Sequence, residues 1–308
     1  MSGTELLAAR IDTLGFSGLD EAALRARFAT RPGMELWDGG DSFIRYRRAG
    51  LEPGADVPSL FILPDGPATI ESYDDFIDAL GDRFAIVIAE IPGFGYSYAR
   101  KAEALRFEDS AAILARLVGE LALPNCVLVG PCVQGLIAMR MAELAGDGVA
   151  GLIVAQTGDF EQQRVWGAER LDAAGVLRKP FAGQVMFREG RIPAAVDWWL
   201  GFCGGKRTPP ALKDTAREVF SGDACYALAS QMQLWLAGNA PELPQPACPA
   251  AVIWGLADKS HRHTDRRSIV AGLPDAAYTE REDLAHFPDL EDPELISQTA
   301  LALLGRTN

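Results

Sequence analysis

The order of apolar and polar positions along the chain predicts strands that alternate with helices. From about residue 43, short β-rich runs are followed by longer segments whose apolar residues recur at helical spacing, such as 109–121 and 135–145. The runs that we expect to form buried strands are Ser59–Leu63, Ala85–Ile91, Cys126–Gly130, Leu152–Gln156 and Ala250–Trp254. This alternation is typical of βαβ units, so we expect an α/β fold with a mainly parallel central sheet flanked by helices.

The alternation is interrupted between about residues 157 and 246, where the pattern is mostly helical and rich in large side chains. An inserted helical lid over the sheet explains this stretch better than a second independent domain. We therefore expect an α/β core at 43–157 and 246–308, a lid at 158–245, and an N-terminal helical extension at 1–42. The extension is expected to contain two short helices, Glu5–Leu14 and Asp20–Ala29.

The composition and net charge of the chain exclude some classes of binding partner. The 308 residues are 48% hydrophobic and 23% charged, which is ordinary for a globular protein, and 29 basic against 42 acidic residues give a formal net charge of −13. Such a surface repels phosphate backbones and anionic membranes, so we expect no nucleic-acid or membrane partner. There is no apolar run of the roughly 18 residues that span a bilayer, and the charged N-terminus does not fit a signal peptide. Five scattered cysteines without a Cys-x-x-Cys pair fit free thiols, so we expect a cytoplasmic protein.

The sharpest chemical signal is a cysteine between a predicted strand and a predicted helix. The apolar run of the strand ends at Gly130-Pro131, Cys132 follows, and the helical pattern starts directly after it. A nucleophile on so tight a turn projects from the backbone, and the amide N–H groups that follow point toward a reacting oxyanion. The helix N-terminus favours negative charge, which populates the reactive thiolate.

Two later segments supply an acid and a base. Asp258 ends the strand pattern that contains Trp254, and His286 lies between a predicted strand and the final helix. The chain has only three histidines, which narrows the choice of a general base near neutral pH. Cys132, Asp258 and His286 thus follow the chain order nucleophile, acid, base.

In this order the motifs resemble the α/β-hydrolase superfamily, in particular its lidded branch. The resemblance covers about residues 43–305 and implies that Cys132 is the nucleophile, His286 its base and Asp258 the group that orients His286. It implies no cofactor. The matching segments are the turn at 130–135, the strand end at 254–258, His286-Phe287-Pro288 and the loop at 91–97.

Three positions depart from the family's usual pattern. Cys132 stands where serine is commonest, and Gln134 stands where glycine or alanine is usual. A bulky side chain at Gln134 is expected to crowd the packing of the helix on the strand. The third departure is Pro64, which replaces the usual histidine of the oxyanion loop.

The register of this loop decides the oxyanion donors. Aligned without a gap, Leu63-Pro64-Asp65-Gly66-Pro67 makes the amide of Gly66 one donor, and the amide of Val133 is the other. A shift by one residue would place Pro67 there, which has no N–H. Asp65 and Glu90, both at strand ends, are expected to hydrogen-bond loop backbone.

A short histidine motif gives a weaker signal. The segment His261-Arg262-His263-Thr264-Asp265-Arg266 partly matches His-x-His-x-Asp-His, but its last position is an arginine. Zinc sites of that kind need more imidazoles than the chain has, so no metal is expected. We expect this segment to be a solvated loop or a first helical turn after Asp258, at the rim of the site.

The leading hypothesis is a Cys-dependent hydrolase of an ester, thioester or lactone, acting through an acyl-enzyme on Cys132. Trp198, Trp199 and Trp235 favour a small-molecule substrate with an apolar or aromatic part. An acyltransferase that uses the same acyl-enzyme stays open. A lyase, an isomerase or a small-molecule-binding protein without a covalent intermediate also stays open, and Gln134 and Pro64 favour it. The sequence leaves open whether the chain forms a homo-oligomer.

Overall fold

A mostly parallel sheet forms the centre of the computed structural model, which describes residues 3–14, 22, 28, 30–190, 193–222, 224–236 and 241–306. The strand order is β1-β2-β4-β3-β6-β7-β8-β9; β2 is antiparallel to β1 and β4, and the other neighbours are parallel. The short β5 (Tyr98–Ala99) pairs with β2. This confirms the expected α/β fold. The strands are β1 (Met34–Asp38), β2 (Ser42–Gly50), β3 (Ser59–Ile62), β4 (Ala85–Ala89), β6 (Cys126–Pro131), β7 (Gly151–Ala155), β8 (Ala250–Gly255) and β9 (Ala277–Arg281).

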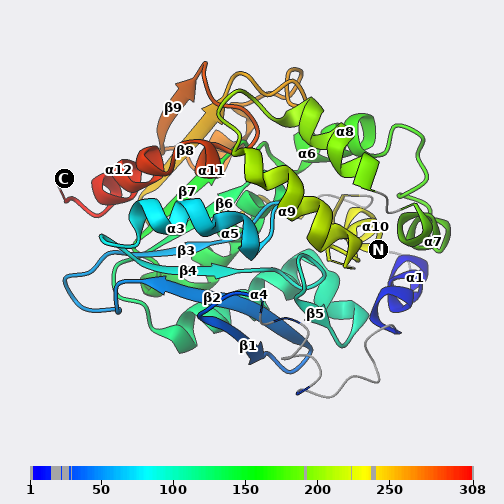
Figure 1. The fold of residues 1–308 in the computed structure, drawn as a ribbon, viewed down its shortest axis with the longest axis horizontal. Coiled ribbons are helices and arrows are strands. Elements are labelled where there is room, and N and C mark those ends of the chain that lie inside the picture. The colour runs from blue at the N-terminus through cyan, green and yellow to red at the C-terminus, as the bar shows by residue number, and fades with distance from the viewer. Residues whose placement is uncertain are drawn as a thin grey trace.

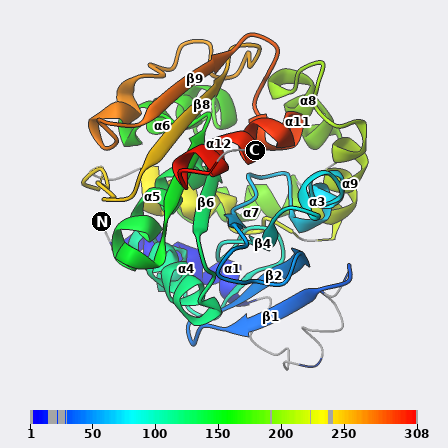
Figure 2. The same cartoon turned by 90° about the vertical axis from the view of Figure 1, so that its left-hand side faces the viewer.

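Helices cover both faces of the sheet (Figure 2). On one face lie α4 (Phe107–Leu121) and α5 (Val133–Ala145); on the other lie α3 (Asp74–Leu80) and α12 (Pro293–Leu303). Successive β6 side chains point to opposite faces, so Leu128 joins the first core while Val127 and Val129 join the second. Because both faces are buried, the strands are continuous apolar runs.

A helical insertion separates β7 from β8 and lies at one end of the sheet (Figure 1). The N-terminal helix α1 (Gly3–Leu14) contacts α7 and α10 of this insertion. The second expected N-terminal helix, Asp20–Ala29, falls mostly outside the described residues. No helix among those described is both long and apolar enough to cross a membrane. The insertion contains α6 (Phe160–Trp166), α7 (Ala182–Glu189), α8 (Pro193–Cys203), α9 (Pro210–Ser221) and α10 (Leu228–Gln231).

The sheet begins earlier than the sequence pattern indicates. Strand β1 lies within residues 1–42, the stretch expected to be a helical extension. Only Leu36 of β1 is buried, and Glu35 and Asp38 are exposed. An edge strand of this kind is held mainly by backbone pairing to β2, so it carries no apolar run to reveal it.

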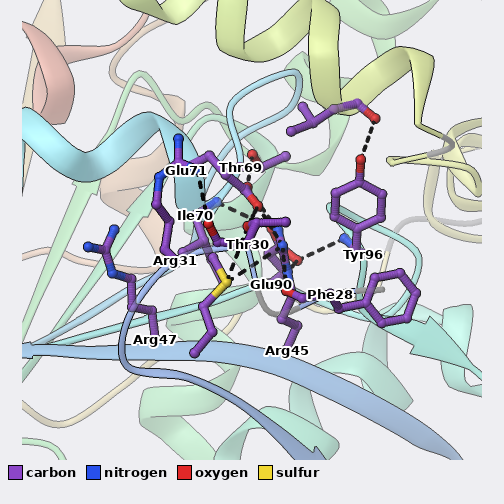
Figure 3. A network of polar contacts seen from close by, with 12 residues as sticks. Phe28, Thr30, Arg31, Arg45, Arg47, Thr69, Ile70, Glu71, Glu90 and Tyr96 are labelled. Carbon is purple, nitrogen blue, oxygen red and sulfur yellow. Dashed lines mark hydrogen bonds and ion pairs between the residues drawn. The ribbon is translucent and has the colours of Figure 1, made fainter. Parts of the chain in front are cut away.

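A buried arginine joins the loops at the ends of two strands to β2 (Figure 3). The guanidinium of Arg45 donates to Glu71 at 2.6 and 3.0 Å and from Nε to Glu90 at 2.8 Å. Glu71 belongs to the 3₁₀ turn that follows β3, and Glu90 directly follows β4. Glu90 also accepts the backbone N–H groups of Ile70 and Tyr96. One guanidinium thus positions both loops.

The two carboxylates respond differently to this contact. Burial by itself raises a carboxyl pKa, but Arg45 and the hydroxyls of Thr30 and Thr69 lower the pKa of Glu71 from 4.5 to about 2. Burial dominates at Glu90, whose pKa is raised although it faces Arg45. The pKa of Arg45 is raised, because the two glutamates outweigh its burial. Arg45 is therefore always charged, and Glu71 is its anionic partner.

We expect Glu71→Gln to lower the free energy of unfolding by about 3–5 kcal/mol, because it breaks a buried ion pair. The folded-state pKa of Glu71 is depressed, so the stabilisation is complete above pH 4.5 and is lost as the pH falls toward about 2. Urea unfolding of both proteins should give a constant difference at pH 5–7 that shrinks below pH 4.5.

Glu161→Gln is the matched control, because both side chains of the Glu161–Arg164 ion pair are exposed to solvent. Loss of this exposed ion pair should change the free energy of unfolding little at any pH. Equal effects of the two substitutions would contradict the role given to Glu71.

Candidate active site

Cys132 occupies a strained turn between β6 and α5. Its backbone has φ 49° and ψ −128°, a conformation that side-chain-bearing residues rarely adopt. The turn is fixed from β7: the Cys132 N–H donates to the Ala155 carbonyl at 2.7 Å, and the Thr157 hydroxyl donates to the Cys132 carbonyl at 2.9 Å. Since α5 begins at Val133, the free amide of Val133 faces the Cys132 thiol. Strain held in this way is typical of a functional position.

Two glycines allow α5 to approach β6 and β7 closely. A Cβ on Gly130 would lie 2.7 Å from the Gln134 carbonyl oxygen, and one on Gly135 would overlap the Thr157 side chain. The close approach therefore depends on Gly130 and Gly135, and Gln134 between them is accommodated. Gln134 itself is fully buried, and neither of its amide atoms has a hydrogen-bond partner among the described residues.

The imidazole of His286 is held by Asp258. His286 Nδ1 lies 2.7 Å from Asp258 Oδ2, and both side chains are fully buried. The other oxygen of Asp258 accepts from the N–H and hydroxyl of Ser260, and Gln156 donates to Oδ2 at 3.1 Å. Burial opposes ionisation, but His286 and these donors lower the pKa of Asp258 to about 2. Asp258 therefore fixes the ring with Nε2 directed away from it.

Asp65 is the unexpected partner of this ring. Its Oδ2 lies 3.1 Å from His286 Nε2, so the imidazole stands between two carboxylates. Burial raises the pKa of Asp65 against the attraction of His286. Burial alone would lower the pKa of His286, but Asp258, Cys132 and Asp65 raise it well above 6.5. The expectation that Asp65 bonds loop backbone missed this contact, although its carbonyl does accept from Ala68.

The Cys132 thiol is fully buried in this group. Burial and the nearby Asp65 raise its pKa to about 12, and His286 opposes that rise. The helix N-terminus therefore does not produce a thiolate in the resting site, contrary to the sequence expectation. Attack by sulfur requires that the thiol proton be transferred as substrate binds.

His261 lies deeper in the site than the sequence expectation placed it. It is only 3% exposed, whereas a solvated loop was expected, and its ring stacks on Trp166 at 4.6 Å and on His286 at 5.3 Å. His261 Nε2 lies 3.8 Å from Cys132 Sγ, and Nδ1 lies 3.0 Å from the Thr264 hydroxyl. Burial and the neighbouring His286 lower the pKa of His261 to about 3. The donor atoms of Cys132, His261 and His286 all lie within 4.8 Å of one another.

An apolar cavity of about 230 Å³ opens between this group and the helical insertion. Asp65, Gly66 and Val133 line it on the side of the sheet. Trp198, Trp199 and Trp235, the residues expected to bind substrate, all line it from the insertion. Trp198 is 60% exposed, whereas Trp199 and Trp235 are buried, and the Trp235 indole donates to the Leu105 carbonyl.

The structure places Cys132, Asp258 and His286 in one buried group. The two expected oxyanion donors and the three tryptophans line the adjoining cavity, whose lining includes Asp65 but neither Cys132 nor His286. The structure adds Asp65, His261 and Gln156. Asp65 lies in the expected oxyanion loop, and that position is the only sequence signal that could have indicated it. Gln156 directly follows β7 and contacts Gly255 and Asp258 at the end of the neighbouring β8. The contact of His261 carries no comparable signal, because it depends on how the loop after β8 folds back.

The chain matches the family model described as alpha/beta hydrolase fold over residues 58–293. It is similar to haloalkane dehalogenase 2 of Mycobacterium tuberculosis, with 24% identity over 266 residues that cover 80% of this chain and 88% of that protein. It is 30% identical to esterase Rv0045c of M. tuberculosis over 152 residues, which cover 48% of this chain and 49% of the esterase.

Among solved structures, the enol-lactonase from Burkholderia xenovorans LB400 superposes with a TM-score of 0.67 at 19% identity, covering 88% of this chain and all of that chain. Haloalkane dehalogenase 2 and the esterase carry the names of hydrolases, so these similarities support the general class of enzyme, and the superposition on the lactonase supports the fold.

The packing of α5 against Thr157 gives a test of the turn. We expect Gly135→Ala to destabilise the protein by about 1–3 kcal/mol, because the new Cβ overlaps Thr157. Thr157→Ala should recover part of this loss in the double variant. Gly119→Ala in α4 is the matched control: its Cβ meets nothing, so it should stabilise by about 0.5–1 kcal/mol. Urea unfolding measures all four proteins, and equal losses at both glycines would contradict the assigned contact.

Proposed function

We propose that this chain, which belongs to the alpha/beta hydrolase family and is an enzyme of the hydrolase type, hydrolyses an ester, thioester or lactone through an acyl-enzyme on Cys132. The observation that carries the proposal is the position of Cys132. It is held at φ 49° between β6 and α5, beside an imidazole that Asp258 orients at 2.7 Å. A nucleophile, a base and an orienting carboxylate in this arrangement are the requirements of covalent acyl transfer.

In this reaction the Cys132 sulfur attacks the carbonyl carbon, and His286 Nε2 accepts the thiol proton. His286 then protonates the leaving alkoxide or thiolate, which departs as the acyl-enzyme forms. A water molecule, deprotonated by His286, adds to the acyl-enzyme and releases the carboxylic acid and the free thiol. Asp258 stabilises the imidazolium in both halves of the reaction.

The amides of Val133 and Gly66 are proposed as the oxyanion donors. The Val133 N–H lies at the start of α5 and has no partner within that helix. Gly66 lines the same cavity, and a Cβ there would press on the Phe94 ring. Loss of one such donor typically costs on the order of 10²–10³ in rate.

Asp65 sets a condition on catalysis. While its carboxylate accepts from His286 Nε2, that nitrogen cannot take the thiol proton. Before Cys132 reacts, the Nε2 proton must therefore pass from His286 to Asp65, and the bound acyl group must displace the protonated Asp65 side chain, so that Nε2 can accept the thiol proton. This requirement keeps the resting thiol neutral and couples attack to substrate binding.

The cavity favours a substrate with an apolar or aromatic acyl or leaving group. Its lining is mostly aromatic and aliphatic, and Trp198, Trp199 and Trp235 line it on the insertion side. We propose that residues 158–245 act as a lid over this cavity and that the enzyme works in the cytoplasm. Cys132 cannot serve as the carboxylate nucleophile of dehalogenase or epoxide-hydrolase chemistry, so neither activity is proposed despite the names of relatives.

The contact between Asp65 and His286 favours a second candidate. A carboxylic acid and an imidazole that share one buried proton can carry out acid–base catalysis without a covalent intermediate. A lyase or isomerase reaction would then use Asp65 and His286 and leave Cys132 unmodified. An acyltransferase differs from the main proposal only in the acceptor, which replaces water.

The test is intact-protein mass after brief exposure to a panel of activated acyl esters and acyl thioesters. We expect a transient acyl adduct on the wild-type protein and none on Cys132→Ala. His286→Asn should slow its formation by about 10⁴-fold. Product analysis with an added alcohol, amine or thiol separates hydrolysis from acyl transfer.

Cys203→Ala is the matched control, because Cys203 is equally buried and its pKa is also raised by burial to about 12. This variant should form the adduct as the wild type does. An adduct on both cysteine variants, or on neither the wild type nor the variants, contradicts the acyl-enzyme. Turnover that survives Cys132→Ala and is lost in Asp65→Asn would instead establish the non-covalent candidate.

A further inference from the structure

We propose that Cys132, His261, His286 and Asp65 form a binding site for one divalent transition-metal ion of the zinc type. The Cys132 sulfur lies 3.8 Å from His261 Nε2, and Asp65 Oδ2 lies 3.1 Å from His286 Nε2. Zinc bonds of about 2.3 Å to sulfur and 2.0–2.1 Å to nitrogen, at tetrahedral angles, separate the ligand atoms by about 3.3–3.6 Å. Small side-chain movements therefore suffice to bring Cys132, His261 and His286 onto one ion, since their ligand atoms all lie within 4.8 Å of one another, and Asp65, which adjoins His286 Nε2, moves further to complete the set.

Both histidines are already oriented as metal ligands are. His286 Nδ1 lies within hydrogen-bond distance of Asp258 Oδ2, at 2.7 Å, and His261 Nδ1 lies 3.0 Å from the Thr264 hydroxyl. Each ring thus keeps Nε2 for the shared centre. A hydrogen bond from the second nitrogen to a carboxylate or other polar group is the usual support of a ligating histidine, since it fixes the ring and its tautomer.

The charges in this region also favour a cation. Two buried carboxyl groups, Asp65 and Asp258, lie 3.1 and 2.7 Å from the two nitrogens of one imidazole, and no basic side chain other than a histidine is in contact with either of them among the described residues. As the ion binds, the Cys132 thiol and the His286 imidazolium each release a proton to solvent, and Asp65 binds as the carboxylate. A divalent ion with one thiolate, one carboxylate and two neutral imidazoles is a neutral centre. One sulfur, two nitrogens and one oxygen suit zinc or cobalt better than calcium or magnesium.

The sequence expectation of no metal rested on the small number of imidazoles, which are too few for a His-x-His-x-Asp-His site. In the structure, His263 of the same segment is exposed and Cys132 comes from the turn after β6, so spacing within 261–266 does not describe the set. Of the four proposed ligands, Asp65 is the one that lines the cavity.

Occupation of this site would inhibit the enzyme, an inference that rests on the proposed function. The ion binds the Cys132 sulfur and His286 Nε2, the two atoms that attack and proton transfer require. Metal binding would therefore hold the enzyme in a reversible inactive state, which a chelator relieves.

The experiment is a titration of metal-free full-length protein with Co²⁺, followed by absorption spectroscopy. We expect one equivalent to bind and to produce a thiolate-to-cobalt charge-transfer band in the near ultraviolet. Cys132→Ser and His261→Asn should lose the band. His263→Asn is the matched control, two residues away on the exposed side of the same loop, and should keep it.

Thr264→Val keeps His261 and removes only the partner of its Nδ1, so it should weaken Co²⁺ binding by about 10–100-fold. Absence of the band in the wild type, or equal loss of it in His261→Asn and His263→Asn, would overturn the proposal. Unfolding curves of the metal-free variants separate loss of ligands from loss of fold.

A second arm separates this inference from the proposed function. One equivalent of Zn²⁺ should suppress the acyl adduct on the wild type, and a chelator should restore it. In His261→Asn the same Zn²⁺ should not suppress whatever adduct that variant forms. A cobalt band without any acyl adduct on metal-free protein would support the metal site and contradict the acyl-enzyme. An acyl adduct without a cobalt band would support the acyl-enzyme and contradict the metal site.

Discussion

The geometry of the cavity depends on one buried guanidinium. Arg45 on β2 binds Glu71 in the turn after β3 and Glu90 at the end of β4, and Glu90 accepts backbone N–H groups on both loops. These loops carry Gly66 and Phe94, which contribute to the same side of the cavity. A loop held only by its own turns would place such groups loosely. Because a buried charge cannot be left without its partners, the ion cluster gives the loops one arrangement.

The sequence predicts much of the fold because the sheet is buried on both faces. Val127, Leu128 and Val129 form a continuous apolar run since successive side chains enter different cores. The edge strand β1 has no such apolar run, because only Leu36 is buried and backbone pairing to β2 supplies most of its stabilisation. Patterning identifies strands that bury side chains, and it misses strands that bury mainly hydrogen bonds.

The candidate site could be predicted only as far as local chain geometry determines it. Cys132, Asp258 and His286 each follow a strand end, so their convergence follows from a parallel sheet. The contacts of Asp65 and His261 depend on how two loops fold back, and nothing in the spacing of 261–266 indicates that His261 stacks on Trp166. The protonation state of the Cys132 thiol could not be predicted from the sequence either. The helix N-terminus favours a thiolate, but complete burial and a nearby carboxylate reverse that preference, and neither is visible in the sequence.

The protein contains the same electrostatic arrangement twice, with different chemical consequences. Arg45 lies between Glu71 and Glu90, and His286 lies between Asp65 and Asp258. A guanidinium cannot lose its proton within a protein, so the first cluster can only hold structure. An imidazole can release a proton, accept one or bind a metal through Nε2. The second cluster therefore combines a similar buried charge pattern with a group that reacts, and it lies beside the one cysteine whose backbone is strained at the start of a helix. Chemistry at this site follows from the replacement of a permanent cation by a titratable one.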